Sequence, residues 1–200
     1  MDKTHGSSIE LKEAITKITR GAQLTTAELE DTLSKEPTDY QYLMLRDIQD
    51  GLVNDDLPYL KAVDSRHDKY CLEPEDLLIS KVGLPFKVAV ADDFQGKKVL
   101  ATGNLFIIRL NRDIIKPWCL KAYFDSEDGI KALEGIASGT VMRHIGVSGI
   151  SSLIIPCPSL EEQQRIENNY REALSKIKDL KRQLASAIEA SKNIFEEVEL

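Results

Sequence analysis

The C-terminal segment, residues 159–200, carries the feature that most limits how this chain can fold. Two series of residues each recur at intervals of seven, and the gaps between the series alternate between four and three. The first series is Ile166, Ala173, Leu180, Ala187 and Ile194, and the second is Tyr170, Ile177, Leu184, Ser191 and Val198. Nine of these ten positions are apolar or aromatic, which is the heptad pattern of a coiled coil.

This pattern predicts one long helix over residues 159–200. The sequence contains no glycine or proline after Ser159, while Pro156 and Pro158 lie just before it. Ser159 and Glu162 have the spacing of a capping box, which marks the start of a helix. At 1.5 Å per residue, the helix would be roughly 60 Å long.

The apolar stripe predicts that this helix pairs with a second helix. Two apolar residues per heptad form a stripe that is narrower than a helix needs on a globular core. We expect the second helix to come from another chain or from another half of the protein, so that the helix acts as a dimerisation or spacer coiled coil. The expected dimerisation residues are Ile166, Tyr170, Ala173, Ile177, Leu180, Leu184, Ala187, Ile194 and Val198. The alternative is a helix that folds back along its own domain.

Residues 9–158 predict an α+β domain, a mixed sheet with short helices, after a disordered leader or tag remnant over residues 1–8. Short apolar runs between turn signals come first and helical patterns follow. The apolar residues between Ile9 and Ile18 have helical spacing. Expected strands lie near residues 41–45, 57–63, 77–79, 87–91, 105–110 and 153–156, and expected helices begin after Thr25, at Pro117 and after Ser126.

Composition and motifs exclude several classes of protein. The three cysteines, Cys71, Cys119 and Cys157, are far apart, so neither a disulfide scaffold nor a metal site is expected, and the chain is expected in the reducing cytoplasm. No apolar run is long enough to cross a membrane. No catalytic motif occurs, and neither Asp55-Asp56 nor Asp92-Asp93 is expected to act in catalysis. We therefore expect a protein without enzymatic activity or cofactor.

The charge of the chain is unevenly distributed. The net charge of −7 argues against nucleic acid, but residues 81–121 contain eight lysines and arginines and only three aspartates. Arg143 and His144 follow a Gly-containing loop that could enter a DNA groove. Side chains at strand ends and in loops could contact phosphates or bases, and the DNA-binding candidates are Arg46, Lys81, Lys87, Lys97, Lys98, Arg112, Arg143 and His144.

Several stretches resemble the specificity (S) subunit of type I restriction-modification systems. The most specific is Ile154 to Ile166, which reads IIPCPSLEEQQRI, and weaker matches in the same order are Leu45–Gly51, Leu72–Gly83, Gly103-Asn104 and Tyr123–Ser126. The likeness covers roughly residues 9–200, as one target recognition domain (9–158) followed by one long helix (159–200).

The resemblance implies a non-catalytic reader of double-stranded DNA. In the family, two recognition domains are held apart by antiparallel helices, methyltransferase (M) subunits dock on this scaffold, and a restriction/translocase (R) subunit can join. This chain has one domain and one helix, so the resemblance implies a half-length subunit that forms a homodimer and reads a bipartite site.

Other interpretations stay open at the level of sequence. The chain could be a fragment of a longer subunit, or the recognition domain at the C-terminus of a fused adenine methyltransferase. The family's methyltransferase motif, Asn or Asp before Pro-Pro and an aromatic residue, does not occur in the sequence. A coiled-coil adaptor that binds only protein is the alternative from a different functional class.

Overall fold

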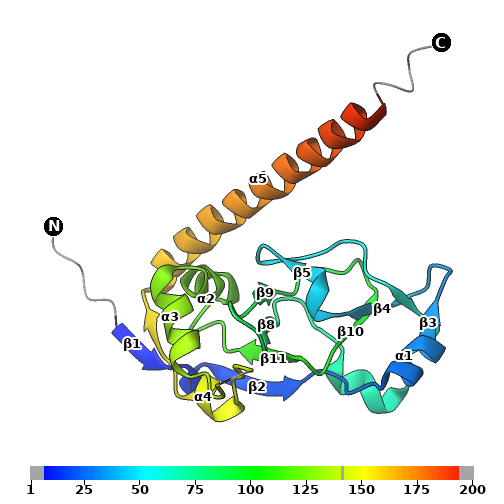
Figure 1. Ribbon diagram of the computed structural model, residues 1–200. Helices are drawn as coiled ribbons and strands as arrows, with labels where there is room; N and C mark the ends of the chain where they lie inside the picture. Colours follow the sequence, from blue (N-terminus) through cyan, green and yellow to red (C-terminus); the bar gives the residue numbers. More distant parts are fainter. Residues whose placement is uncertain (1–6, 141, 194–200) are drawn as a thin grey trace.

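The computed structural model describes residues 7–140 and 142–193, and it shows a domain of short strands and helices from which one long helix projects (Figure 1). This arrangement confirms the expected α+β fold with a long C-terminal helix. Two expected dimerisation residues, Ile194 and Val198, lie outside the described residues.

A four-stranded antiparallel sheet forms the centre of the domain. Its order is β2-β11-β8-β9, and its strands are β2 (Ile15–Arg20), β11 (Leu105–Leu110), β8 (Leu77–Ser80) and β9 (Val88–Val90). Side chains of β11 alternate between the two faces: Phe106 and Ile108 enter one core cluster, while Leu105 and Ile107 enter another. Both faces of the sheet are therefore covered, which explains the unbroken apolar run of this strand.

A second sheet is mixed, as expected. Its order is β10-β4-β7-β3, and its strands are β10 (Lys98–Ala101), β4 (Tyr40–Leu43), β7 (Tyr59–Leu60) and β3 (Leu33–Ser34). Strands β10 and β4 run parallel, with Lys98 beside Tyr40, and the other pairs are antiparallel. This sheet lies at the end of the domain that also carries α1 (Thr26–Thr32) (Figure 1).

The other described strands form two short two-stranded ribbons. Strands β5 (Ile48–Gln49) and β6 (Leu52–Val53) form a hairpin, and its turn residues Asp50 and Gly51 have φ angles of 50° and 75°. Such left-handed angles are typical of an Asp-Gly hairpin turn. The other ribbon pairs β1 (Ser7–Glu10) with β12 (Ile154–Cys157).

The helices begin where local signals predicted them. Thr25 caps α1 in a capping box with Glu28, Pro117 occupies the first turn of α2 (Pro117–Phe124), and Ser126 caps α3 (Glu127–Gly135). The remaining helices are α4 (Val147–Ser151), the long α5 (Leu160–Asn193), and the 3-10 turns η1 (Leu11–Glu13), η2 (Leu45–Asp47) and η3 (Ser65–Tyr70).

The helical interpretation of residues 9–18 is wrong. This segment forms the end of β1, the turn η1 and the start of β2. Its strands pair with β12 and β11, which are distant in sequence, so long-range hydrogen bonds override the local periodicity. Strand β1 begins at Ser7, two residues before the expected start of the domain.

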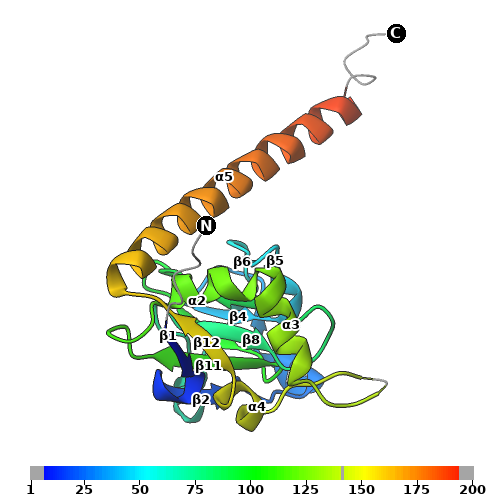
Figure 2. The ribbon, with the colours of Figure 1, turned by 90° about the vertical axis from the view of Figure 1, so that its left-hand side faces the viewer.

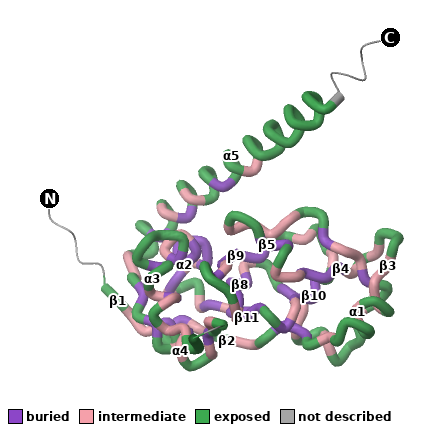
Figure 3. The backbone as a smooth tube through the Cα atoms, viewed as in Figure 1, coloured by how far each residue is buried: buried purple, intermediate pink, exposed green. Residues whose placement is uncertain are grey.

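Helix α5 packs on the domain only near its beginning. The burial pattern changes from mixed to fully exposed along the helix (Figure 3). Ser159 caps it, because its Oγ donates to Glu162 Oε2 at 2.8 Å and accepts from the backbone N–H of Glu162 at 3.3 Å. Leu174 is the last buried residue of the helix within the described part of the chain.

Candidate nucleic-acid interface

The first turn of α5 is fixed by Gln163. Its buried side-chain oxygen accepts from the backbone N–H of Lys116 at 2.8 Å. Its amide nitrogen donates to the carbonyls of Ile114 and Pro158, each at 2.9 Å. One side chain thereby joins α5 to the start of α2 and to the loop before α2, so the direction in which α5 leaves the domain is set by specific hydrogen bonds.

A buried polar cluster lies about two turns further along α5, where this helix packs against α2. Lys121 is 0% exposed, and its Nζ donates to Tyr170 Oη at 3.0 Å and to the carboxylate of Asp125. Tyr170 Oη also donates to that carboxylate. Burial lowers the pKa of Lys121, against the pull of Asp125. Burial and the neighbouring Asp125 carboxylate both raise the pKa of Tyr170.

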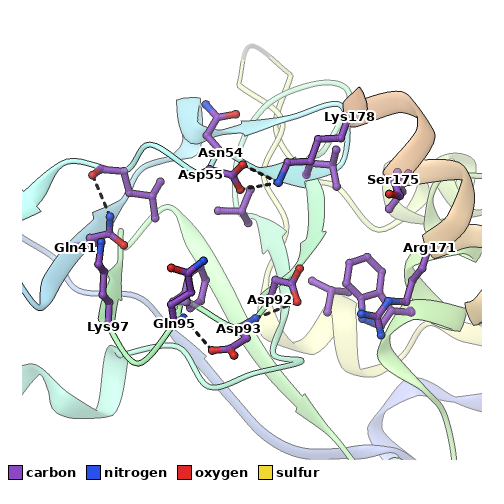
Figure 4. A pocket seen from close by; sticks show the side chains of 17 residues that line it. Gln41, Asn54, Asp55, Asp92, Asp93, Gln95, Lys97, Arg171, Ser175 and Lys178 are labelled. Carbon is purple, nitrogen blue, oxygen red and sulfur yellow. Dashed lines mark hydrogen bonds and ion pairs between the residues drawn. The ribbon is translucent and has the colours of Figure 1, made fainter. Parts of the chain in front are cut away.

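Two ion pairs continue the contact toward the hairpin β5–β6. Lys178 Nζ lies 2.7 Å from Asp55, and Lys181 pairs with Asp50 in the hairpin turn. Between α5 and the domain lies a cleft of about 630 Å³, and Figure 4 shows Lys178 and Arg171 on its helix side with Asp55 and Asp92 among the residues opposite. The cleft is lined by both signs of charge, so it favours neither a phosphate nor a metal ion.

Beyond these contacts, α5 exposes an apolar stripe. Ile177, Leu180, Leu184 and Ile188 are 40%, 53%, 61% and 47% exposed. Spacings of three and four place them on one side of the helix. Ala173, Ala187 and Ser191 are exposed as well. We call Ile177, Leu180, Leu184 and Ile188 the α5 stripe.

Ile166 and Tyr170, which the heptad pattern assigned to the dimer seam, lie elsewhere. Both pack against the core of their own domain. The fold-back alternative therefore describes the first turns of α5, and the coiled-coil interpretation is restricted to the positions after Leu174.

The basic candidates do not form one continuous patch. Lys87 is engaged internally, because its Nζ donates to the carbonyls of Leu45 at 3.0 Å and Ile48 at 2.6 Å. Two exposed cations carry acidic partners: Lys98 lies 3.3 Å from Asp68, and Arg112 pairs with Glu75.

Two further candidates lie next to these. Lys97 precedes Lys98, donates to Tyr59 Oη at 3.3 Å and lies over that ring. Arg46 is exposed, 3.9 Å from Asp47, and follows Leu45, whose carbonyl accepts from Lys87.

The structure does bring Lys81, Arg143 and His144 together. Val82 pairs with His144 in an antiparallel bridge, and the N–H of Ile145 donates to the carbonyl of Lys81 at 2.9 Å. Arg143 Nη2 donates to the carbonyl of Glu134 at the end of α3, 2.7 Å away, and Arg143 Nε is buried with no partner among the described residues. Arg143 therefore braces its loop, while His144 is exposed.

Two exposed apolar residues beside this group were not identified from the sequence. Leu84 is 54% exposed and Met142 is 69% exposed. The signals for them in the sequence are weak. Leu84 lies between Gly83 and Pro85, and Met142 follows Gly139 by three positions. Sequence spacing does not show that these two loops meet.

The described residues limit other kinds of site. Across residues 7–140 and 142–193, no helix is long and apolar enough to cross a membrane. Within the same ranges, no group of three or more His, Cys, Asp or Glu side chains is arranged to hold a metal ion.

Nearly the whole chain has the fold of somewhat less than half of a type I specificity subunit. The chain is similar to the HsdS subunit from Thermoanaerobacter tengcongensis, with a TM-score of 0.56 and 20% identity over 92% of this chain and 41% of that one. It is similar to the type I restriction-modification S subunit from M. genitalium, with a TM-score of 0.60 and 17% identity over 98% of this chain and 46% of that one. The chain therefore spans less than half the length of each of these S subunits.

A third similar structure is an enzyme. The type IIG restriction endonuclease BpuSI matches with a TM-score of 0.56 and 16% identity over 85% of this chain and 26% of that chain. No protein-family model and no curated protein matches the sequence.

Proposed function

We propose that this chain is a non-catalytic recognition subunit that binds a specific double-stranded DNA sequence and places the M subunits of a type I restriction-modification system on it. The observation that carries the proposal is the fold: one recognition domain and one long helix match two S subunits over 92% and 98% of this chain. An R subunit is the further partner expected in a system that also cleaves DNA. The cytoplasm is the compartment in which such a complex would meet DNA.

The proposal includes a homodimer through the α5 stripe. Burying a leucine or isoleucine side chain contributes about 1.5–3 kcal/mol, so four such residues on each of two helices provide a substantial driving force. A two-fold axis across the helices would make them antiparallel and place one domain at each end. The complex would then read a bipartite, palindromic site. Ala187, Ile194 and Val198 extend the proposed seam, whereas Ala173 lies before Leu174, in the part of the helix that packs on its own domain.

Charge reversal within the α5 stripe tests the dimer. We expect the wild-type chain to have twice its monomer mass in light scattering and Leu180→Glu/Leu184→Glu to be a monomer. Lys176→Glu is the matched control, because this exposed position lies on the same helix outside the stripe. A wild type that stays monomeric at all concentrations would contradict the dimer.

Duplex DNA binding tests the recognition function itself. A gel shift at low salt, with the M subunits of the same system added, should show a complex that weakens steeply as salt is raised. Lys81→Glu should weaken it. Absence of any duplex complex, together with capture of a protein partner, would favour the coiled-coil adaptor.

The match to BpuSI favours a second candidate, a recognition domain that works within a single-chain enzyme. The two candidates differ in the behaviour of α5. A domain of that kind would bind its site as one copy, whereas the S-subunit proposal requires two. Measuring the number of chains per DNA duplex by native mass spectrometry separates them.

A further inference from the structure

Three elements meet around the buried side chain of Lys121. Helix α2 contributes Lys121 itself and ends at Asp125, its C-cap residue. Helix α5 contributes Tyr170, and the hairpin of β5 and β6 contributes Gly51 in its turn. Figure 2 shows α2 and this hairpin on the side of the domain that faces α5. The cluster therefore lies between the domain and the long helix.

Gly51 lies directly against the ammonium group of Lys121. A Cβ atom added at Gly51 would lie 2.6 Å from Lys121 Nζ and 3.3 Å from Asp125 Oδ2. Lys121 is 0% exposed and its Nζ donates to two partners, so it could move away only by breaking those hydrogen bonds. The φ angle of Gly51, 75°, favours glycine as well. The hairpin turn thus fits against the cluster because this position has no side chain.

The hairpin is also joined directly to α5. Lys181 pairs with Asp50, the residue before Gly51, and Lys178 pairs with Asp55, shortly after the hairpin. Exposed ion pairs of this kind contribute little to stability. The buried contact at Gly51 therefore does more to determine where the hairpin lies. We call the meeting point of α2, α5 and the β5–β6 hairpin the α5 junction.

The angle of α5 depends on a second point of attachment. Gln163 holds the first turn of the helix, but a helix held at one turn can still pivot about it. The α5 junction supplies contacts further along, from Tyr170 to Lys181. Helix α5 has 34 residues and is roughly 50 Å long, so a tilt of about 4° displaces its far end by about 3.5 Å. This displacement is close to the rise of one base pair, about 3.4 Å.

We propose that Gly51 is a positioning residue for the spacing of the bipartite site. Its contact with Lys121 seats the β5–β6 hairpin in the α5 junction, and the junction sets the angle between α5 and the domain. In a dimer joined by the α5 stripe, this angle sets the number of base pairs between the two half-sites. The inference rests on the proposed function, which it deepens by naming a residue that controls the spacing through Lys121.

Gly51→Ala tests the inference, and Gly96→Ala is the matched control. Gly96 also has a left-handed backbone, with a φ angle of 81°, but a Cβ atom added there would meet no atom of the described residues within 4 Å. Both substitutions therefore strain a turn, and only Gly51→Ala places a methyl group against Lys121. The difference between the two variants separates the contact from the backbone strain.

The measurement is selection from a random-sequence duplex library with the M subunits present. We expect wild type and Gly96→Ala to select the same two half-sites at one spacing. Gly51→Ala should select the same half-site bases at a changed spacing or at several spacings. It should bind the wild-type spacing about tenfold more weakly, because the duplex must be deformed to fit.

Lys121→Met is the second variant, for the case in which circular dichroism shows that Gly51→Ala does not fold. This substitution keeps an unbranched side chain and removes the ammonium group that Gly51 contacts. We expect it to change the spacing in the same way, again with unchanged half-site bases.

The other outcomes overturn the inference in distinguishable ways. If the folded variant keeps the wild-type bases and spacing, the contact at Gly51 serves stability alone, while the proposed function stands. If Gly96→Ala changes the spacing as well, strain and not the contact with Lys121 is responsible. If Gly51→Ala changes the selected bases, the hairpin acts in recognition and not in positioning. If wild type selects no bipartite site, the proposed dimeric function itself fails.

Discussion

At the scale of single residues, the hydrogen bonds that a lysine makes within the protein determine whether its side chain is available to contact DNA. Lys81 and Lys87 lie six positions apart, and both were candidates for DNA contacts. The structure directs Lys87 inward to two carbonyls of the η2 region, while the contact found for Lys81 is made by its backbone carbonyl, which accepts from the N–H of Ile145 next to the bridge between Val82 and His144. Nothing in the local sequence separates them, because the carbonyls that bind Lys87 come from residues about forty positions away.

Substitution of these two lysines should therefore have opposite effects. Lys87→Met leaves the carbonyls of Leu45 and Ile48 without their donor, and we expect the free energy of unfolding in urea to fall by about 1–3 kcal/mol. Lys81→Met should change it by less than about 0.5 kcal/mol and weaken DNA binding instead. Equal effects on stability would contradict the structural role of Lys87.

Tyr170 predicts a dependence of stability on alkaline pH. Burial and Asp125 raise its pKa in the folded chain, whereas an unfolded tyrosine titrates near its ordinary value of 10.0. Above that pH the unfolded state releases a proton that the folded state keeps, so the stability due to Tyr170 falls, by at most about 1.4 kcal/mol per pH unit. Lys121 shifts stability the other way, because its lowered pKa makes the folded state lose its proton first.

The comparison of wild type with Tyr170→Phe isolates the tyrosine, since both chains contain Lys121. Urea unfolding between pH 8 and pH 11, conditions that bracket the ordinary tyrosine pKa, should show a steeper loss in wild type. Parallel curves would show that the Tyr170 hydroxyl is not protected by the cluster.

At the scale of secondary-structure elements, the attachment of α5 depends on neighbouring residues of the same type. Gln163 is buried and makes three hydrogen bonds to backbone groups, while Gln164 is exposed and bonds within the helix to Asn168 at 2.9 Å. The two residues are adjacent, but the rotation of the helix between them directs Gln163 into the domain and Gln164 into solvent.

This contrast gives a matched pair of variants. Gln163→Ala removes the acceptor of the Lys116 N–H and one donor from each of the carbonyls of Ile114 and Pro158, and we expect a loss of about 1–3 kcal/mol in the free energy of unfolding. Gln164→Ala should change it by less than about 0.5 kcal/mol. Similar losses for both would mean that α5 is not held by the buried amide.

The elements also show what the sequence could predict. The starts of α1, α2, α3 and α5 depend on residues within one turn, so capping signals located them correctly. Residues 9–18 were misassigned, because their strands are defined by partners ninety or more positions away. The same reason applies to the candidate site: a bridge between Val82 and His144 brings their two loops together, and no local sequence pattern indicates it.

At the scale of the whole molecule, the chain has the dimensions of half a specificity subunit. It spans 41% and 46% of the two S subunits that it resembles. Its helix is fixed to the domain up to Lys181 and exposes the α5 stripe over its outer part. Under the proposed function, the first half of the helix sets an angle and the second half joins the subunits.

Dimerisation predicts a thermal stability that depends on protein concentration. The single tryptophan, Trp118, is buried near α5, with the guanidinium of Arg171 5.2 Å from its ring, so its fluorescence reports on this junction. We expect Tm to rise by a few degrees for each tenfold increase in wild-type concentration. The monomeric variant Leu180→Glu/Leu184→Glu should have a constant Tm. A wild-type Tm independent of concentration would argue against the dimer.

The ribbon of β1 and β12 has a consequence for how specificity could change. Ser7 pairs with Cys157, and α5 begins at Leu160, so the two ends of the domain meet at the base of the helix. A different domain inserted between these two strands would leave the helix, its cap and the α5 stripe unaltered. Under the proposed function, the domain between these strands is an exchangeable cassette, so that one recombination step could change the target sequence and leave the α5 stripe in place.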